Sequence, residues 1–195
     1  VGEEVRGALV GGEAAGDADR QGLGVEGVLQ LLEGRRRLAV AGGLGDQPLA
    51  RARLLDTMGR VYQQLELHEV AEKFVREALA IREASLGREH PEVAASLAHL
   101  GDLQWVRGEY PAAEATLRRA LAIQERASGA EALAVAEVLD NLGTVLEIQA
   151  RYAEAEPTHE RALAIRERAL GPNALPVAAS LDDLGVSHLA RGDRP

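Results

Sequence analysis

The sequence predicts an all-α fold, a right-handed α-solenoid of helix-turn-helix repeats, and three observations support this prediction. Glycines recur with a period of 42 residues, as at Gly59, Gly101, Gly143 and Gly185. Apolar residues between them return at spacings of three and four, which is typical of amphipathic helices. Aromatic residues make up only 3 % of the chain, and abundant alanine, leucine, glutamate and arginine favour helices over strands. A fixed period of this size indicates units that stack on their neighbours.

Each period is expected to contain two helices joined by a short turn. In the second period, Val93, Leu97, Leu100 and Leu103 form one apolar stripe. The predicted helix pairs are about 51–66 with 69–86, 92–107 with 110–128, and 134–149 with 152–170, followed by a lone first helix at about 176–190. The turns within the pairs are expected at 67–69, 107–110 and 150–152. Glycines such as Gly129 follow each second helix, where a left-handed backbone costs glycine little.

The glycine inside each first helix requires a packing reason, because a mid-helix glycine costs about 0.5–1 kcal/mol relative to alanine. Small residues such as Ala113 and Ala155 recur at one position of the second helices. We therefore expect each glycine to face one of these alanines, so that the two helix axes approach closely.

The first part of the chain differs from the rest, since residues 1–45 hold 12 of the 21 glycines. We expect residues 1–22 to be disordered and residues 23–47 to form an atypical N-terminal helix or cap. The repeats are then assigned to 48–91, 92–133 and 134–175, with 176–195 as the first helix of a truncated fourth. Because the chain starts with Val1 and stops within a repeat, we interpret it as a fragment or as a predicted gene product with imperfect ends.

Composition limits the class of function. A net charge of −9 argues against nucleic acid, whose phosphates are neutralised by Lys and Arg, and against anionic membranes. The absence of cysteine removes disulfides, thiolate metal sites and thiol nucleophiles, and it fits a cytoplasmic protein. No apolar run is long enough to span a bilayer.

The residue pattern also predicts no enzyme, no cofactor and no metal. The run Gly22-Leu23-Gly24-Val25-Glu26-Gly27 matches a dinucleotide fingerprint, but no strand precedes it. The five histidines lack the i, i+4 spacing of a helical zinc site, so we interpret them, His159 and His188 included, as ordinary substitutions at repeat positions. Glutamates at 72, 114 and 156 are expected on exposed faces, the first two paired with arginines four residues on.

A family resemblance rests on the residues that repeat. Leu97, Leu100, Gly101, Ala113 and Ala120 of the second period resemble the tetratricopeptide repeat (TPR), and the same pattern occurs in the first and third periods and begins in the fourth. The 42-residue length and the phrase Ala-Leu-Ala-Ile-Arg-Glu at 78–83 and 162–167 are similar to the kinesin light chain-like subtype. The resemblance implies a non-enzymatic scaffold that binds proteins or peptides in a concave groove.

A narrower resemblance concerns residues 47–62, which are similar to the start of repeat arrays that follow bacterial Ser/Thr protein kinase domains. It implies an alternative function, the regulatory or sensing arm of a multidomain bacterial enzyme whose catalytic domain is absent from this chain. Self-association through the truncated C-terminal end is a second alternative, because Val177, Leu181, Leu184 and His188 lack part of their cover.

In the TPR family, the first helices line the groove. The resemblance therefore assigns the following peptide-binding residues: Arg53, Asp56, Thr57, Arg60, Gln63, His99, Asp102, Trp105, Asp140, Asn141, Thr144 and Glu147. The acidic members predict a basic or mixed-charge peptide as partner. Trp105, the only tryptophan, is the expected centre of the binding energy, since tryptophan is enriched in binding hot spots.

Overall fold

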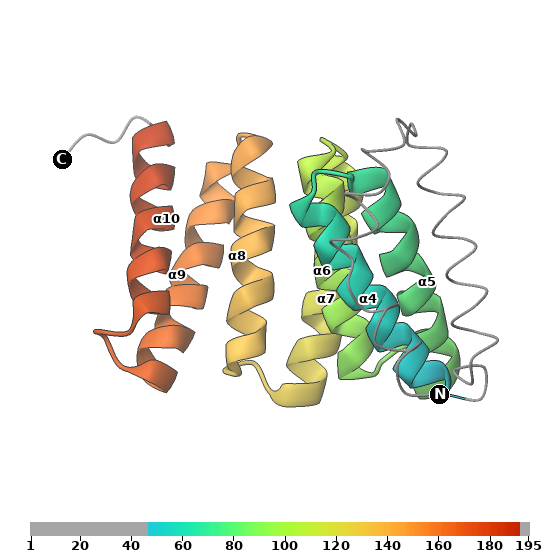
Figure 1. The fold of residues 1–195 in the computed structure, drawn as a ribbon. Coiled ribbons are helices and arrows are strands. Elements are labelled where there is room, and N and C mark those ends of the chain that lie inside the picture. The colour runs from blue at the N-terminus through green and yellow to red at the C-terminus, as the bar shows by residue number, and fades with distance from the viewer. Residues whose placement is uncertain (1–46, 192–195) are drawn as a thin grey trace. The chain divides into compact units, whose positions relative to one another are not determined.

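A computed structural model describes residues 47–191, which form seven helices and no strand. The helices of this range are α4 (Pro48–Gln64), α5 (His68–Leu86), α6 (Pro91–Val106), α7 (Tyr110–Ser128), α8 (Leu133–Ile148), α9 (Tyr152–Leu170) and α10 (Leu175–Arg191) (Figure 1). Each boundary lies within three residues of the predicted one. The predicted all-α class is confirmed, and the helices follow one another in TPR-like pairs. The predicted disordered segment and cap lie outside the described residues, except for Gln47.

The chain divides into two compact units, residues 1–85 and 86–195, which are described separately. The described part of unit 1 is one antiparallel pair, α4 and α5, whose facing sides are apolar. Tyr62 and Phe74 stack with ring centroids 5.5 Å apart and an interplanar angle of 24°. Leu55 and Val75 are also buried, so burial of apolar area is the main contribution to this pairing.

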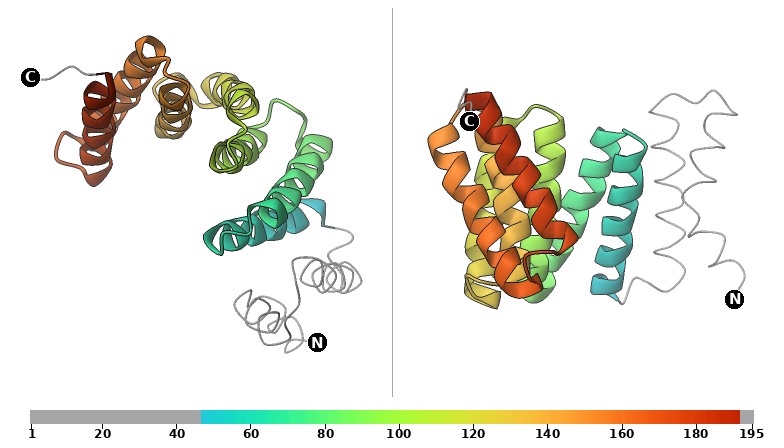
Figure 2. Two further views of the ribbon diagram at one scale, coloured as in Figure 1. Left: turned by 90° about the horizontal axis from the view of Figure 1, so that it is seen from above. Right: turned by 90° about the vertical axis from the view of Figure 1, so that its left-hand side faces the viewer.

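Unit 2 is a run of helices in which each packs on the next. The helix α6 packs on α7, α8 on α9, α7 on α8, and α10 on α9 (Figure 2). We call α6–α7 repeat 2 and α8–α9 repeat 3. Each second helix therefore contacts both its own first helix and the next first helix, as expected of stacked repeats.

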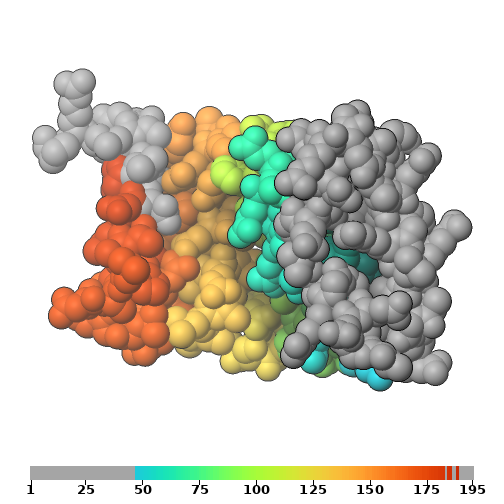
Figure 3. All heavy atoms as spheres, in the orientation of Figure 1, coloured from blue at the N-terminus to red at the C-terminus, as the bar shows by residue number. Residues whose placement is uncertain are grey.

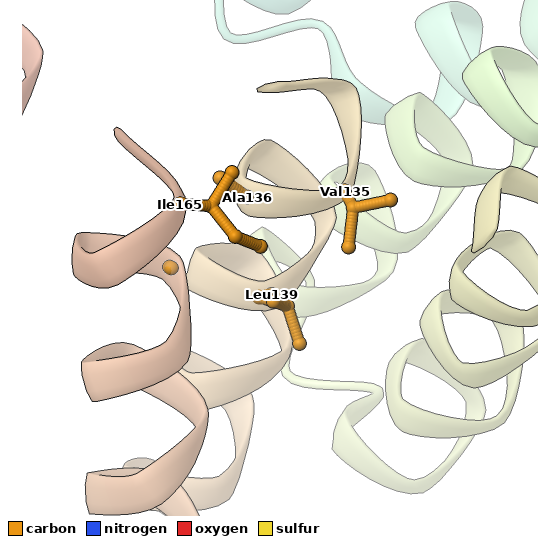
Figure 4. Packing of buried hydrophobic residues seen from close by; sticks show 5 residues of the cluster. Val135, Ala136, Leu139 and Ile165 are labelled. Atoms are coloured by element: carbon orange, nitrogen blue, oxygen red, sulfur yellow. The ribbon is translucent and has the colours of Figure 1, made fainter. Parts of the chain in front are cut away.

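The core of repeat 3 joins α8 to α9. Val135, Ala136 and Leu139 of α8 meet Ala162 and Ile165 of α9 in one buried cluster, and Leu121 of α7 packs against it (Figure 4). The three residues of α8 follow the helical period, so one side of α8 is apolar. A residue from the preceding repeat thus takes part in the core of this one.

Two kinds of turn connect the helices. Gly129 and Gly171 follow the second helices with φ 86°, ψ 152° and φ 83°, ψ 157°. The prediction of a left-handed α backbone at these two glycines is wrong, because their ψ angles lie outside that conformation. The observed combination of φ and ψ is essentially restricted to glycine. Within the pairs, Glu66, Gly108 and Ala150 share one repeat position and all have positive φ (61°, 77° and 58°). The turn at Glu66 lies before the predicted turn at 67–69, because α5 already begins at His68.

The glycines inside the first helices do lie at close contacts, but not with the predicted alanines. A Cβ placed on Gly101 would lie 2.7 Å from Cγ of Leu117, and one on Gly143 would lie 2.5 Å from Nε2 of His159. Leu117 and His159 each stand four residues after the predicted partner, one helical turn along the same face. The glycine therefore makes room for a large side chain.

The last described helix, α10, is covered on one side only by the described residues. Val177 and Leu184 are buried, whereas Leu181 is 51 % exposed and Leu175 is 84 % exposed. The space-filling view places the surface of α10 at the left-hand edge (Figure 3). The predicted apolar stripe of this helix is thus half buried against α9.

Candidate protein-binding face

The outward side of α6 and α8 carries the residues of unit 2 that the sequence assigned to peptide binding. We call this surface the first-helix face. His99 and Asp102 of α6, and Asn141 and Thr144 of α8, are partly exposed and follow helical spacing along their helices. Because α6 and α8 lie in contact, these side chains lie on neighbouring helices. Thr144 Oγ1 donates a hydrogen bond to the carbonyl of Asp140 at 3.0 Å, which fixes its rotamer.

Trp105 stands in the last turn of α6, on the same stripe as Asp102. The side chain is partly exposed, while its indole Nε1 is buried and has no acceptor among the described residues. Next to it, Val106 is 41 % exposed, and Ile148, one repeat later, is 46 % exposed. The C-terminal end of the first-helix face is therefore apolar, a feature that the sequence analysis missed although Val106 and Ile148 occupy equivalent positions.

Two acidic residues of this set, Asp140 and Glu147, are turned toward the inside of repeat 3. Their side chains are each 17 % exposed. Asp140 forms an ion pair with Arg166 of α9, and Oε1 of Glu147 lies 3.4 Å from Nε2 of His159. The face of α8 is accordingly less acidic than the sequence suggested.

The corresponding residues of unit 1 lie on α4. Arg53, Thr57 and Arg60 are exposed and Gln63 is partly buried, whereas Asp56 is buried. Asp56 accepts a hydrogen bond from Arg60 at 3.0 Å, and Arg82 of α5 lies 3.6 Å from the same oxygen. Asp56 is thus held by two cations.

The arginine partners of these aspartates were not predicted, yet the repeat register contains a signal for them. Arg166 of repeat 3 contacts both Asp140 of the same repeat and Ser180 of α10. The register of the first repeat has the same three residue types, Asp56, Arg82 and Ser96. In the intervening period, the three equivalent positions hold neutral residues, Ala98, Gln124 and Val138. All three positions change together, as expected when one partner alone would leave a buried charge.

A second polar network joins repeat 2 to the turn of repeat 3. Glu114 Oε2 lies 2.7 Å from Nη1 of Arg151 and accepts a hydrogen bond from Gln149, while Arg118 donates to Oε1 at 2.9 Å. Burial alone would raise the pKa of Glu114, but the hydrogen bonds from Arg151, Arg118 and Gln149 bring it below its usual value. In return, the hydrogen bond to Glu114 raises the pKa of Arg151.

The prediction that the glutamates at 72, 114 and 156 are exposed is wrong. Glu72 is 9 % exposed, and the side chains of Glu114 and Glu156 are 16 % and 24 % exposed. Glu72 and Glu114 each pack beside an arginine. The predicted i, i+4 pairs themselves are confirmed, with N–O distances of 2.6 Å for Arg76–Glu72 and 2.9 Å for Arg118–Glu114.

Residues 47–191 contain neither a cluster that could bind a metal ion nor a helix that could span a membrane. No group of three or more His, Asp or Glu side chains in this part of the chain could hold a metal ion. None of the described helices is long and apolar enough to cross a lipid bilayer.

Antiparallel helix pairs that repeat in register, with glycine inside each first helix, define a helical-repeat protein. The tetratricopeptide repeat family matches residues 50–126 and 132–195. The chain therefore belongs to the tetratricopeptide repeat family, whose arrays are typically protein-binding modules. The match covers repeats only, and no catalytic domain is evident.

Solved structures agree with this assignment. BtubC (BKLC) from P. vanneervenii is 26 % identical, with a TM-score of 0.72, over 97 % of this chain and 76 % of that one. A kinesin light chain-like protein of Podosopora anserina with nearly identical TPR-like repeats is 22 % identical, with a TM-score of 0.71, over 98 % and 88 %. The apo form of RapI is 17 % identical, with a TM-score of 0.68, over 93 % and 47 %. No curated protein matches the chain. The structural relatives are thus kinesin light chain-like TPR proteins.

Proposed function

We propose that this chain is a non-enzymatic scaffold and that the first-helix face of α6 and α8 binds a segment of another protein. The observation that carries the proposal is the apolar end of this face. Val106 and Ile148 are exposed at the same position of successive helices, and Trp105 stands beside the first of them. Exposed apolar side chains that recur in register on one face are a common mark of an interaction site.

The charges of this face favour a mixed-charge partner over a strongly basic one. Asp102 keeps partial exposure on α6, Asp140 forms an ion pair with Arg166 inside repeat 3, and Asn141 and Thr144 of α8 are neutral. We therefore propose a segment that places an apolar side chain at the Trp105 end and a basic residue near Asp102. In unit 1, Arg53, Thr57, Arg60 and Gln63 of α4 are proposed as a separate set of peptide contacts.

The test uses the tryptophan as both probe and anchor. The tagged full chain captures partners from a lysate of the source cells, and a purified captured protein is then titrated while Trp105 emission is followed. We expect a shift in emission, and a loss of about 1–2 kcal/mol of binding free energy in Trp105→Ala. Leu170→Ala is the matched control, because Leu170 is 42 % exposed but ends a second helix. Equal binding by Trp105→Ala and wild type would exclude the proposed anchor.

Self-association remains an alternative favoured by one observation, the 51 % exposure of Leu181 on α10. If this face joins two copies, the chain should form a dimer in sedimentation velocity, and Leu181→Lys should return it to the monomer. A wild-type monomer at about 100 μM would exclude this alternative. A dissociation constant above that concentration corresponds to a binding free energy of little more than about 5 kcal/mol.

A further inference from the structure

The centre of repeat 3 contains a titratable side chain that the proposed function does not use. His159 of α9 is 1 % exposed, and its ring covers Gly143 of α8. The equivalent residue of repeat 2 is Leu117, and that of α5 is Val75, both buried and apolar. His159 is therefore buried at a position that is apolar in the other repeats, and each of its two ring nitrogens needs a hydrogen-bond partner.

Each ring nitrogen of His159 faces a carboxylate of α8. Nδ1 lies 3.7 Å from Oδ1 of Asp140, and Nε2 lies 3.4 Å from Oε1 of Glu147. All four of these atoms are buried, and none of them has a hydrogen-bond partner within the described residues. Buried polar atoms are normally paired, so this arrangement requires a donor between ring and carboxylate on both sides.

Only one protonation state of the ring supplies both donors. A neutral imidazole has a single N–H, whereas the imidazolium donates from both nitrogens. The charges agree with this requirement. Asp140, Glu147 and Arg166 together carry one net negative charge, which a protonated His159 cancels. Two more ionisable residues belong to the neighbouring turns: Glu156 stands three residues before His159 on α9, and Nδ1 of His188 on α10 lies 3.7 Å from Oε1 of Glu156.

We propose that His159 is a proton-binding site that couples the packing of α8 on α9 to pH. Small shifts bring each N–H within hydrogen-bond distance of its carboxylate, since the two present separations exceed that range by a few tenths of an ångström. Loss of the proton leaves Glu147 without a counter-charge and frees it to turn outward. The first-helix face then gains a negative charge at the end where Trp105 lies in the preceding repeat. This proposal does not depend on the identity of any binding partner.

The direction of the pH effect follows from proton linkage. The two N–H contacts to the carboxylates exist only while the ring carries both protons, so the contribution of these contacts to stability is lost when the ring becomes neutral as the pH rises.

The experiment measures urea unfolding of the full chain between pH 5.5 and 9. We expect the unfolding equilibrium constant of the wild type to rise at least about tenfold over this range, the change expected when a hydrogen bond between charged groups is lost. His159→Leu should remove this rise, because it copies Leu117, which already fits against a glycine in repeat 2. His188→Gln is the matched control, since His188 is 46 % exposed, and should retain the rise.

Nitrogen-15 spectra of the histidine rings test the proposal independently of any core variant. The His159 ring, assigned by its absence in His159→Gln, should show two protonated nitrogens at pH 6.5. A neutral His159 ring at pH 6.5 would overturn the proposal. So would an equal rise in the unfolding constant of wild type and His159→Leu.

Discussion

Repeats 2 and 3 share their helix lengths and a close contact at the glycine, but they differ in the residues that lie inside the helix pair. Both pair a 16-residue first helix with a 19-residue second helix, and both place a glycine under a large side chain of the second helix. Three interior positions nevertheless differ in charge. Repeat 3 has charged or titratable residues where repeat 2 has neutral ones: Asp140, Arg166 and His159 against Ala98, Gln124 and Leu117.

This difference shows which positions determine the repeat and which are interchangeable. The glycine and the buried alanines of the second helices are constant, because they set the distance between helix axes. The polar positions vary. Asp140 and Arg166 vary together, because a single buried charge without its partner is strongly destabilising, whereas His159 varies separately, since Val75 is its counterpart in the first period. A helix pair can therefore be joined by apolar contacts alone or by apolar contacts together with ions.

The largest expected effect is a loss of stability when the glycine that both repeats share is replaced. Gly143→Val and Gly101→Val should each destabilise the chain by about 1–3 kcal/mol, because the new side chain would overlap His159 or Leu117. Urea unfolding followed by circular dichroism measures this change. Gly185→Val is the matched control, since nothing lies within 4 Å of a Cβ at Gly185, and its midpoint should hardly change. Three equal midpoints would show that the glycines are not at close contacts.

The next effect should separate the two interiors. Arg166→Gln alone leaves Asp140 without its ion pair and should cost about 1–3 kcal/mol, less than a fully buried pair, because both side chains keep some exposure. The double variant Asp140→Ala with Arg166→Gln copies repeat 2 and should recover most of the loss. A double-mutant cycle in urea gives the coupling energy. If the two losses simply add, the residues do not act as a set.

The smallest effect concerns Glu114, whose counterpart Glu156 has a glutamate, Glu160, where Glu114 has Arg118. Because the pKa of Glu114 is lowered in the folded chain, its contribution to stability is present above the usual glutamate value of about 4.3 and is lost as the pH falls through the lower folded value. Thermal unfolding from pH 6 to pH 3 should therefore show a smaller fall in midpoint for Glu114→Gln than for wild type. Glu156→Gln is the control, and an equal fall for Glu114→Gln and wild type would contradict the pKa shift.

Much of the fold could be predicted from the sequence because its signals are local. Helix positions follow from apolar spacing and from breakers such as Gly129 and Pro91, which act over a few residues. The partner of Gly143 was predicted one helical turn away, as Ala155 rather than His159, because periodicity shows which face two helices share but not their axial offset. Pro157 lies inside α9, a position that a sequence reading would normally assign to a helix end.

The candidate site was less predictable for the same reason. Sequence spacing places Asp140 and Glu147 on the outward side of α8 together with Asn141. That the two acidic side chains turn inward is visible only from their side-chain conformations. The arginine and histidine that they meet are on α9, so the interaction depends on how two helices dock. The assignment of binding residues on this face remains a prediction.

The turn inside each helix pair affects how the repeats can diverge. Glu66, Gly108 and Ala150 all take a positive φ, although only glycine does so without steric cost, and other residues lose about 1–2 kcal/mol there. The docked helices impose this backbone shape whichever residue occupies it. Two of the three turns therefore have the backbone geometry that suits glycine without having a glycine. An idealised array designed from this chain would restore glycine at both turns and recover that strain without altering any helix surface.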